Sequence, residues 1–184
     1  MQRLLFVFVL LLPFFARAQE DPSLHIAAGM YTAIETKQYD TTILLALQLK
    51  KKYRGTATAE RADLCLVQAY LGKDDLRHAN RYARKIFRKP AFPGFSRKMT
   101  RKCITKHICS ELFYRYYESE NNAKQAVKYL VKTVDKYPIT GCGTGRNNYK
   151  YNNYKIIADY YTQLGKTRKA AKYERKRFAI YNHP

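Results

Sequence analysis

The chain has 184 residues and carries 35 Lys and Arg against 14 Asp and Glu, a formal net charge of +21. Apolar residues make up 46% of it, which is enough to build a core and excludes a wholly disordered chain. Eight Gly and six Pro exclude collagen-like and low-complexity classes and are few for a turn-rich β protein. The length fits one domain or one extended array.

The first 18 residues have the parts of a secretory signal peptide. Arg3 precedes an apolar run from Leu4 to Ala16, and Ala16-Arg17-Ala18 has the form of a cleavage site. A helix needs about 20 residues to span a bilayer, and this run is shorter. We therefore expect the segment to be cleaved off rather than retained as a membrane anchor. The mature chain, residues 19–184, would then be periplasmic or secreted, with 33 basic and 14 acidic residues and no transmembrane segment.

Helix-favouring segments broken by short polar turns fill the rest of the chain. They predict helices at 22–36, 40–53, 58–72, 74–89, 96–119, 122–136, 150–164 and 166–181. We therefore expect a single all-α domain over 19–184, built from four antiparallel helix pairs. The glycine-rich run 141–146 lacks the Lys-Ser/Thr ending of a P-loop, so it is interpreted as a loop between pairs.

A nine-residue spacing relates the predicted pairs to one another. A tyrosine in the first helix precedes an alanine in the second by nine residues in three pairs: Tyr70 and Ala79, Tyr117 and Ala126, Tyr161 and Ala170. A large apolar residue stands four positions before each tyrosine: Leu66, Phe113 and Ile157. The first pair has Ala33 and Thr42 at the equivalent places. This pattern is typical of helices that cross closely, where only a small side chain fits beside an aromatic ring.

The segment 112–138 resembles the tetratricopeptide repeat family, with Phe113, Tyr117, Ala126, Leu130 and Pro138 at matching positions. The resemblance extends over about residues 23–181 and implies a right-handed helical-repeat solenoid of about four helix–turn–helix units. The repeats depart from the family in length, since the small residues at 42, 79, 126 and 170 lie 37, 47 and 44 apart, which places insertions at 90–108 and 139–152. The usual early Trp is absent, and an irregular helical bundle is the alternative fold.

The resemblance also implies a concave face, lined by the first helices, that receives a peptide or a partner helix. The matching positions are Arg61, Gln68, Ile108, Glu111, Arg115, Glu118, Lys155 and Asp159. They do not reproduce a carboxylate-clamp pattern, so no peptide class is implied. We expect an exported, non-enzymatic scaffold that binds a protein or peptide there.

Clusters of basic residues predict a second surface and an alternative function. The residues that we select from them are Arg81, Arg84, Arg88, Arg97, Arg101, Lys102, Lys169, Lys172 and Lys176. Like charges at helical spacing repel unless an anion lies against them. The alternative is therefore electrostatic binding to an anionic polymer, lipid headgroups or nucleic acid, of which nucleic acid is the least expected for an exported chain. A merely solvated basic face is the third interpretation.

The cysteines and histidines offer little catalytic chemistry. In an oxidising compartment, four cysteines permit two disulfides, for which we favour Cys103 with Cys142 and Cys65 with Cys109; free thiols are the alternative. Cys103 and His107 lie four residues apart, as two zinc ligands on one helix would, but a closed site needs ligands that the sequence does not identify. We predict no catalytic site, no metal and no cofactor.

Overall fold

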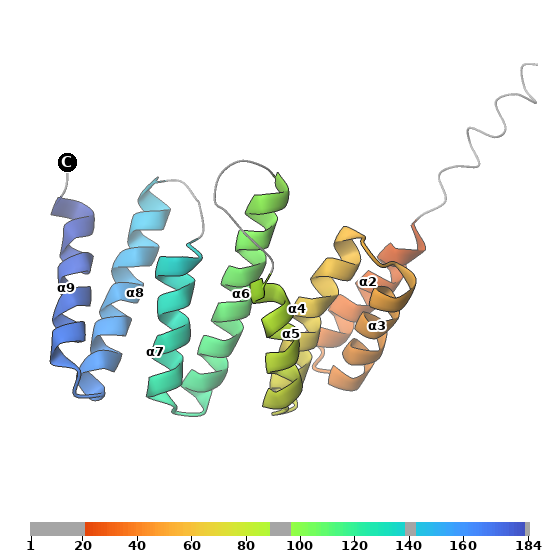
Figure 1. Cartoon of the computed structure of the whole chain (residues 1–184), viewed down its shortest axis with the longest axis horizontal. Coiled ribbons are helices and arrows are strands. Elements are labelled where there is room, and N and C mark those ends of the chain that lie inside the picture. Colours follow the sequence, from red (N-terminus) through yellow and green to blue (C-terminus); the bar gives the residue numbers. More distant parts are fainter. Residues whose placement is uncertain (1–20, 89–96, 139–142, 183–184) are drawn as a thin grey trace, which may run out of the picture.

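The computed structural model describes residues 21–88, 97–138 and 143–182, except for the side chains of 97–101 and 143. The signal peptide predicted at 1–18 lies outside this range. The described residues form helices and no strand, which confirms the predicted all-α class (Figure 1). The elements are α2 (Pro22–Glu35), α3 (Tyr39–Lys52), α4 (Ala57–Gly72), α5 (Leu76–Arg88), α6 (Arg97–Ser119), α7 (Ala123–Val131), the π-helical η1 (Lys132–Lys136), α8 (Gly143–Gln163) and α9 (Thr167–Asn182).

Helix ends agree with the prediction to within two residues, with one large exception. Helix α8 begins at Gly143 instead of residue 150, so the loop predicted for 141–146 is wrong over 143–146. Much of the insertion expected at 139–152 is therefore helical, as are residues 97–108 in α6. Gly and Asn are poor helix formers, but Tyr149 packs against the core of the last helices, and such packing overrides propensity.

The helices pair in chain order, α2 with α3, α4 with α5, α6 with α7 and α8 with α9. Figure 1 shows these pairs following one another along the molecule, from α2 and α3 at one end to α8 and α9 at the other. The first two pairs meet mainly through α3 and α4 and also through α2 and α4. The second and third pairs meet through α4 and α6 and through α5 and α6, and the last two meet through α7 and α8. None of the helices in the described ranges is long and apolar enough to cross a membrane.

The turn inside each pair has the same backbone geometry. A residue with positive φ follows the first helix in all four: Lys37, Asp74, Asn121 and Gly165. The next residue donates its N–H to the carbonyl five positions back, at 2.8 Å in every case; the acceptors are Ala33, Tyr70, Tyr117 and Tyr161. This 6→1 bond defines a Schellman cap. The acceptors are the four positions aligned in the sequence, so the repeated spacing reflects a repeated turn.

The small residues of the nine-residue spacing lie at close helix crossings. Ala79, Ala126 and Thr42 are fully buried, and Ala170 is nearly so. The apolar residues four positions before the tyrosines, Leu66, Phe113 and Ile157, are also fully buried. Packing, rather than chemistry, therefore accounts for this part of the pattern.

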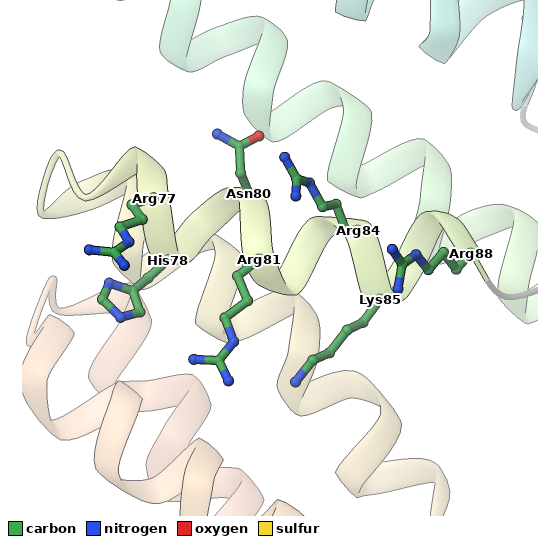
Figure 2. Close-up of a pocket in the computed structure, with 7 residues that line it drawn as sticks. All are labelled: Arg77, His78, Asn80, Arg81, Arg84, Lys85 and Arg88. Carbon is green, nitrogen blue, oxygen red and sulfur yellow. The ribbon is translucent and has the colours of Figure 1, made fainter.

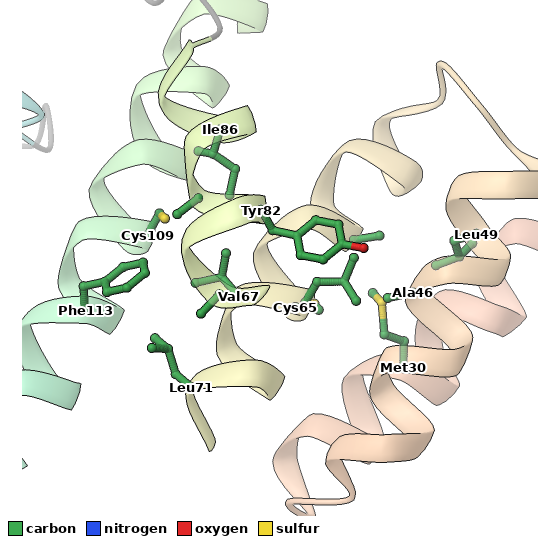
Figure 3. Packing of buried hydrophobic residues seen from close by; sticks show 14 of the residues in the cluster. Met30, Ala46, Leu49, Cys65, Val67, Leu71, Tyr82, Ile86, Cys109 and Phe113 are labelled. Atoms are coloured by element: carbon green, nitrogen blue, oxygen red, sulfur yellow. The ribbon is translucent and has the colours of Figure 1, made fainter. Parts of the chain in front are cut away.

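The buried residues form two clusters. The larger one extends from α2 to α6, includes Tyr129 of α7, and contains Met30, Leu49, Val67 and Phe113 (Figure 3). The smaller one joins α7, η1, α8 and α9. Tyr114 of α6 packs against both clusters, so it lies where the two halves of the core meet.

Gly72 at the end of α4 tests how closely neighbouring pairs pack. A Cβ at this position would lie 2.3–2.7 Å from the ring atoms of Tyr39 in α3. We expect Gly72→Ala to lower the free energy of unfolding by up to about 1 kcal/mol, because the Tyr39 ring must move and the gain from alanine in a helix offsets part of that cost. Gly145 of α8 is the matched control, because its Cβ would meet nothing within 4 Å.

The measurement is urea unfolding of both variants. Gly145→Ala should be neutral or stabilising by about 0.5–1 kcal/mol, as expected for alanine in an unstrained helix. If the two substitutions change the free energy of unfolding equally, Tyr39 and Gly72 are not closely packed.

Candidate functional site

A hollow of about 480 Å³ lies between α6 and α8. Helix α6 contributes Glu111, Tyr114, Arg115 and Glu118, α7 and η1 contribute Leu130 and Thr133, and α8 contributes Tyr149, Asn153 and Ile156. The hollow thus combines aromatic rings, two aliphatic side chains and charged groups of both signs. Its volume falls in the range typical of ligand clefts. We call it the α6–α8 groove.

Hydrogen bonds join the two helices at one end of this groove. The carboxylate of Glu118 in α6 accepts from the hydroxyl of Tyr114 and, at 3.1 Å, from the hydroxyl of Tyr160 in α8. The two tyrosine rings meet edge to face, with centroids 6.5 Å apart. Burial and the bond to Glu118 raise the pKa of Tyr114 far above its ordinary value, so its hydroxyl stays a donor. These contacts hold that end of the groove in one shape.

Arg115 provides the exposed cation of the groove. Its guanidinium donates two bonds to Oε1 of Glu111, one turn earlier on α6, at 2.6 and 3.1 Å. Its side chain is 71% exposed. Across the groove, burial raises the pKa of Tyr149 to about 12, so this ring carries no charge at neutral pH. An incoming ligand therefore meets one cation, Arg115, the two carboxylates of Glu111 and Glu118, and neutral tyrosines.

His107 lies buried next to this groove but is held as a structural group. Its Nδ1–H donates to the backbone carbonyl of Tyr137 at 2.8 Å, and its Nε2 lies 3.8 Å from Oε2 of Glu111. The His107 ring lies 6.0 Å from that of Tyr149. Across the residues that the structure describes, no three His, Cys, Asp or Glu side chains gather as a metal site would require. The bond to the Tyr137 carbonyl links α6 to the end of η1.

The residues predicted for a concave face do not all lie together. Glu111, Arg115 and Glu118 line the α6–α8 groove. Lys155 and Asp159 form an exposed ion pair at 2.8 Å on α8 and are not among its lining residues. Arg61 and Gln68 are exposed on α4 and also lie outside this lining.

The α8 wall was missed because the residues predicted on that helix, Lys155 and Asp159, lie outside the lining, and because the start of the helix was predicted too late. Tyr149, Asn153 and Ile156 are spaced as i, i+4 and i+7, which is one face of a helix. Tyr149 lies before the predicted start at residue 150, so the face was cut short. Extending the predicted helix back into the Asn-rich stretch before residue 150 would have placed Tyr149 on this face.

The basic residues predicted on the helix at 74–89, which is α5, lie along one hollow. Figure 2 shows seven side chains of α5 around it, five of them cationic: Arg77, Arg81, Arg84, Lys85 and Arg88. The hollow is open and measures about 900 Å³. Its other two lining residues are His78 and Asn80, and His78 is bonded to Asp75 at the start of the helix at 2.6 Å. Within the described part of the chain, none of the five cations forms an ion pair with a carboxylate.

The remaining predicted basic residues have varied surroundings. The side chains of Arg97 and Arg101 lie outside the described residues, and Lys102 is half-buried. Lys169 and Lys172 are exposed on α9, with Lys169 Nζ 5.5 Å from the ring centre of Tyr161. Lys176 instead donates to Asp135 at 2.7 Å, so its charge is neutralised.

Basic residues concentrate on the second helices of the pairs. The second helices α3, α5, α7 with η1, and α9 carry 18 Lys and Arg against 3 Asp and Glu. The first helices α2, α4, α6 and α8 carry 10 against 6. The positive charge of the described helices is therefore unevenly distributed between the two sets.

The structure corrects one predicted disulfide. Cys65 and Cys109 are free thiols, both buried in the larger core cluster, so the bridge predicted between them is absent. Burial raises the pKa of Cys65 to about 11 and that of Cys109 to about 12, although Lys132 works against the latter shift. Each packs as a small apolar side chain of low reactivity. Cys103 is also a free thiol, and its predicted partner Cys142 lies outside the described residues.

The sequence matches no family model, and neither the curated proteins nor the solved structures give a match to this chain.

Proposed function

We propose that this protein is an exported, non-enzymatic binding scaffold, a tetratricopeptide-like array of four helix pairs that holds a segment of a partner polypeptide in the α6–α8 groove. The observation that carries the proposal is the α6–α8 groove itself. It is a hollow of about 480 Å³ with aromatic, aliphatic and charged walls. Three of the positions that the repeat resemblance implied for peptide contact, Glu111, Arg115 and Glu118, line it.

The chemistry of the groove supports a polypeptide ligand. Tyr114 and Tyr149 offer aromatic faces, and Ile156 offers an exposed aliphatic surface. Such side chains provide contact area at a low entropic cost. Arg115 and Glu111 add one charge of each sign, which suits a segment with backbone carbonyls and mixed side chains. The bond between Tyr160 and Glu118 holds the walls before binding, which reduces the ordering needed on association.

Peptide selection tests this function without a known partner. A displayed library of random peptides is selected against the immobilised mature chain, and the enriched peptides are measured by fluorescence polarisation. We expect Arg115→Ala and Ile156→Ala each to weaken binding by roughly tenfold or more, as for residues central to an interface. Arg115 is exposed, so its removal should not unfold the chain.

Lys155→Ala is the matched control for Arg115→Ala. Each substitution removes the cation of an exposed i, i+4 ion pair, but only Arg115 lines the groove. The control should bind the selected peptides as the unchanged chain does. The proposal fails if no peptide is enriched, or if the enriched peptides bind all three variants equally.

A further inference from the structure

The cationic face of α5 is the strongest charged feature outside the α6–α8 groove. Its four arginines, Arg77, Arg81, Arg84 and Arg88, are spaced by four, three and four residues. At 1.5 Å per residue and 100° per residue they lie about 4.5–6 Å apart within a narrow stripe, over a length of about 16 Å. All four are exposed, and Lys85 lies beside them. The stripe therefore presents a regular series of cations.

No carboxylate within the described structure pairs with this series of cations. None of the five cations of α5 has an ion-pair partner there, whereas Lys50, Lys73 and Lys176 elsewhere in the described chain each contact an aspartate. Repulsion between neighbouring cations on one helix face costs stability. An anion bound along the stripe would remove that cost.

Lysines of the next pair extend the positive surface beyond the end of α5. Lys132 Nζ lies 5.3 Å from the ring centre of Phe87 in α5 and 4.4 Å from that of Tyr129. The Phe87 ring stacks on Tyr137 at 5.8 Å, and Lys136 lies 5.6 Å from the latter ring. Burial, followed by the charges of Lys128 and Lys136, lowers the pKa of Lys132. These lysines are therefore close enough to repel one another, as the arginines of α5 are.

We propose that α5 is a binding track for a soluble linear polyanion that bears phosphate or sulfate groups at intervals of about one helical turn. Arginine suits this ligand, because its planar guanidinium donates two parallel bonds to a phosphate or sulfate oxygen pair. Regular spacing lets one polymer contact four arginines in succession, whereas a single small anion would contact one or two. The track is independent of the α6–α8 groove, to which α5 contributes no residue.

The test uses an abasic phosphodiester oligomer with eight phosphates, labelled at one end, and fluorescence polarisation at several salt concentrations. Neutralising four or five phosphates predicts a slope of about −3 in a plot of log K against log salt. We expect Arg81→Gln combined with Arg84→Gln to weaken binding more than tenfold at low salt. The same double variant should reduce the slope by about 1–1.5.

The matched control is Lys169→Gln combined with Lys172→Gln, which removes two exposed charges at the same spacing from α9. It should weaken binding less than about threefold, since it changes the net charge but leaves the track intact. Equal losses in the two double variants would overturn the proposal in favour of diffuse attraction. It is also overturned if the oligomer does not bind at low salt while vesicles containing phosphatidylglycerol do.

Discussion

Replacing Phe113 by alanine is expected to lower the free energy of unfolding by about 3–5 kcal/mol, the range found for buried aromatic residues. Phe113 is fully buried in α6, and its ring stacks on Tyr129 of α7 with centroids 4.8 Å apart and lies 6.3 Å from Tyr117. Truncation therefore leaves a cavity between the two helices of the third pair. Urea unfolding followed by circular dichroism measures the effect.

Phe178→Ala is the control for this experiment. The substitution is the same, but Phe178 is 54% exposed on α9, where the guanidinium of Arg177 lies 5.4 Å from its ring centre. We expect a change of about 0.5 kcal/mol or less there. A similar loss at both positions would show that the third pair has no tightly packed core at Phe113.

Asp135→Asn is expected to lower the free energy of unfolding by about 1–2 kcal/mol, because hydrogen bonds to a charged group are stronger than neutral ones, while the partial exposure of this carboxylate to solvent reduces the effect. The carboxylate of Asp135 in η1 accepts from Tyr154 of α8 at 2.9 Å, and from Tyr173 and Lys176 of α9 at 3.0 and 2.7 Å. One side chain thus ties three helical elements together. Hydrogen exchange should show the loss of protection mainly in α8 and α9.

The same carboxylate makes a contribution to stability that depends on pH. Desolvation raises the pKa of Asp135, but the hydrogen bonds from Lys176 and Tyr154, together with the charge of Lys176, outweigh it and leave the pKa below its ordinary value of 3.8. A lowered pKa in the folded state means that the contribution is complete above the ordinary pKa and is lost as the pH falls through the lowered value. Between pH 5 and pH 2.5 the Tm of the unchanged chain should therefore fall more steeply than that of Asp135→Asn.

Asp40→Asn separates this effect from general acid unfolding. Asp40 also contacts a lysine, Lys73, but its side chain is 86% exposed. Exposed pairs contribute little, so this variant should follow the unchanged chain at every pH. If Asp40→Asn and Asp135→Asn change the dependence of Tm on pH equally, the contacts of Asp135 do not stabilise the fold.

The paired helices could be predicted from the sequence because their signals are local. The nine-residue spacing between Tyr117 and Ala126 reflects a capped turn and a close crossing, and both depend on residues within one pair. Contacts between pairs have no such signal. No sequence pattern around Asp135 predicted its hydrogen bonds to Tyr154 and Tyr173, which lie 19 and 38 residues further along the chain.

The candidate site was predicted only in its α6 wall. Glu111 and Arg115 stand on a strongly helical segment, so their common face could be inferred. The α8 wall begins among Gly and Asn residues, whose low propensity hid the first turns of the helix and with them Tyr149. The residues predicted on the rest of that helix, Lys155 and Asp159, lie outside the groove lining.

The bridge expected between Cys65 and Cys109 is absent, and both thiols pack into the core. Sequence separation and an oxidising compartment allow a disulfide but do not determine which cysteines pair.

Binding of one selected peptide to Arg115→Ala and Lys155→Ala tests the central claim most directly. The account predicts roughly a tenfold loss for Arg115→Ala, no loss for Lys155→Ala, and the same peptide affinity with or without the phosphodiester oligomer bound to α5. Equal affinity of both variants for the peptide would contradict the assignment of the α6–α8 groove as the binding site.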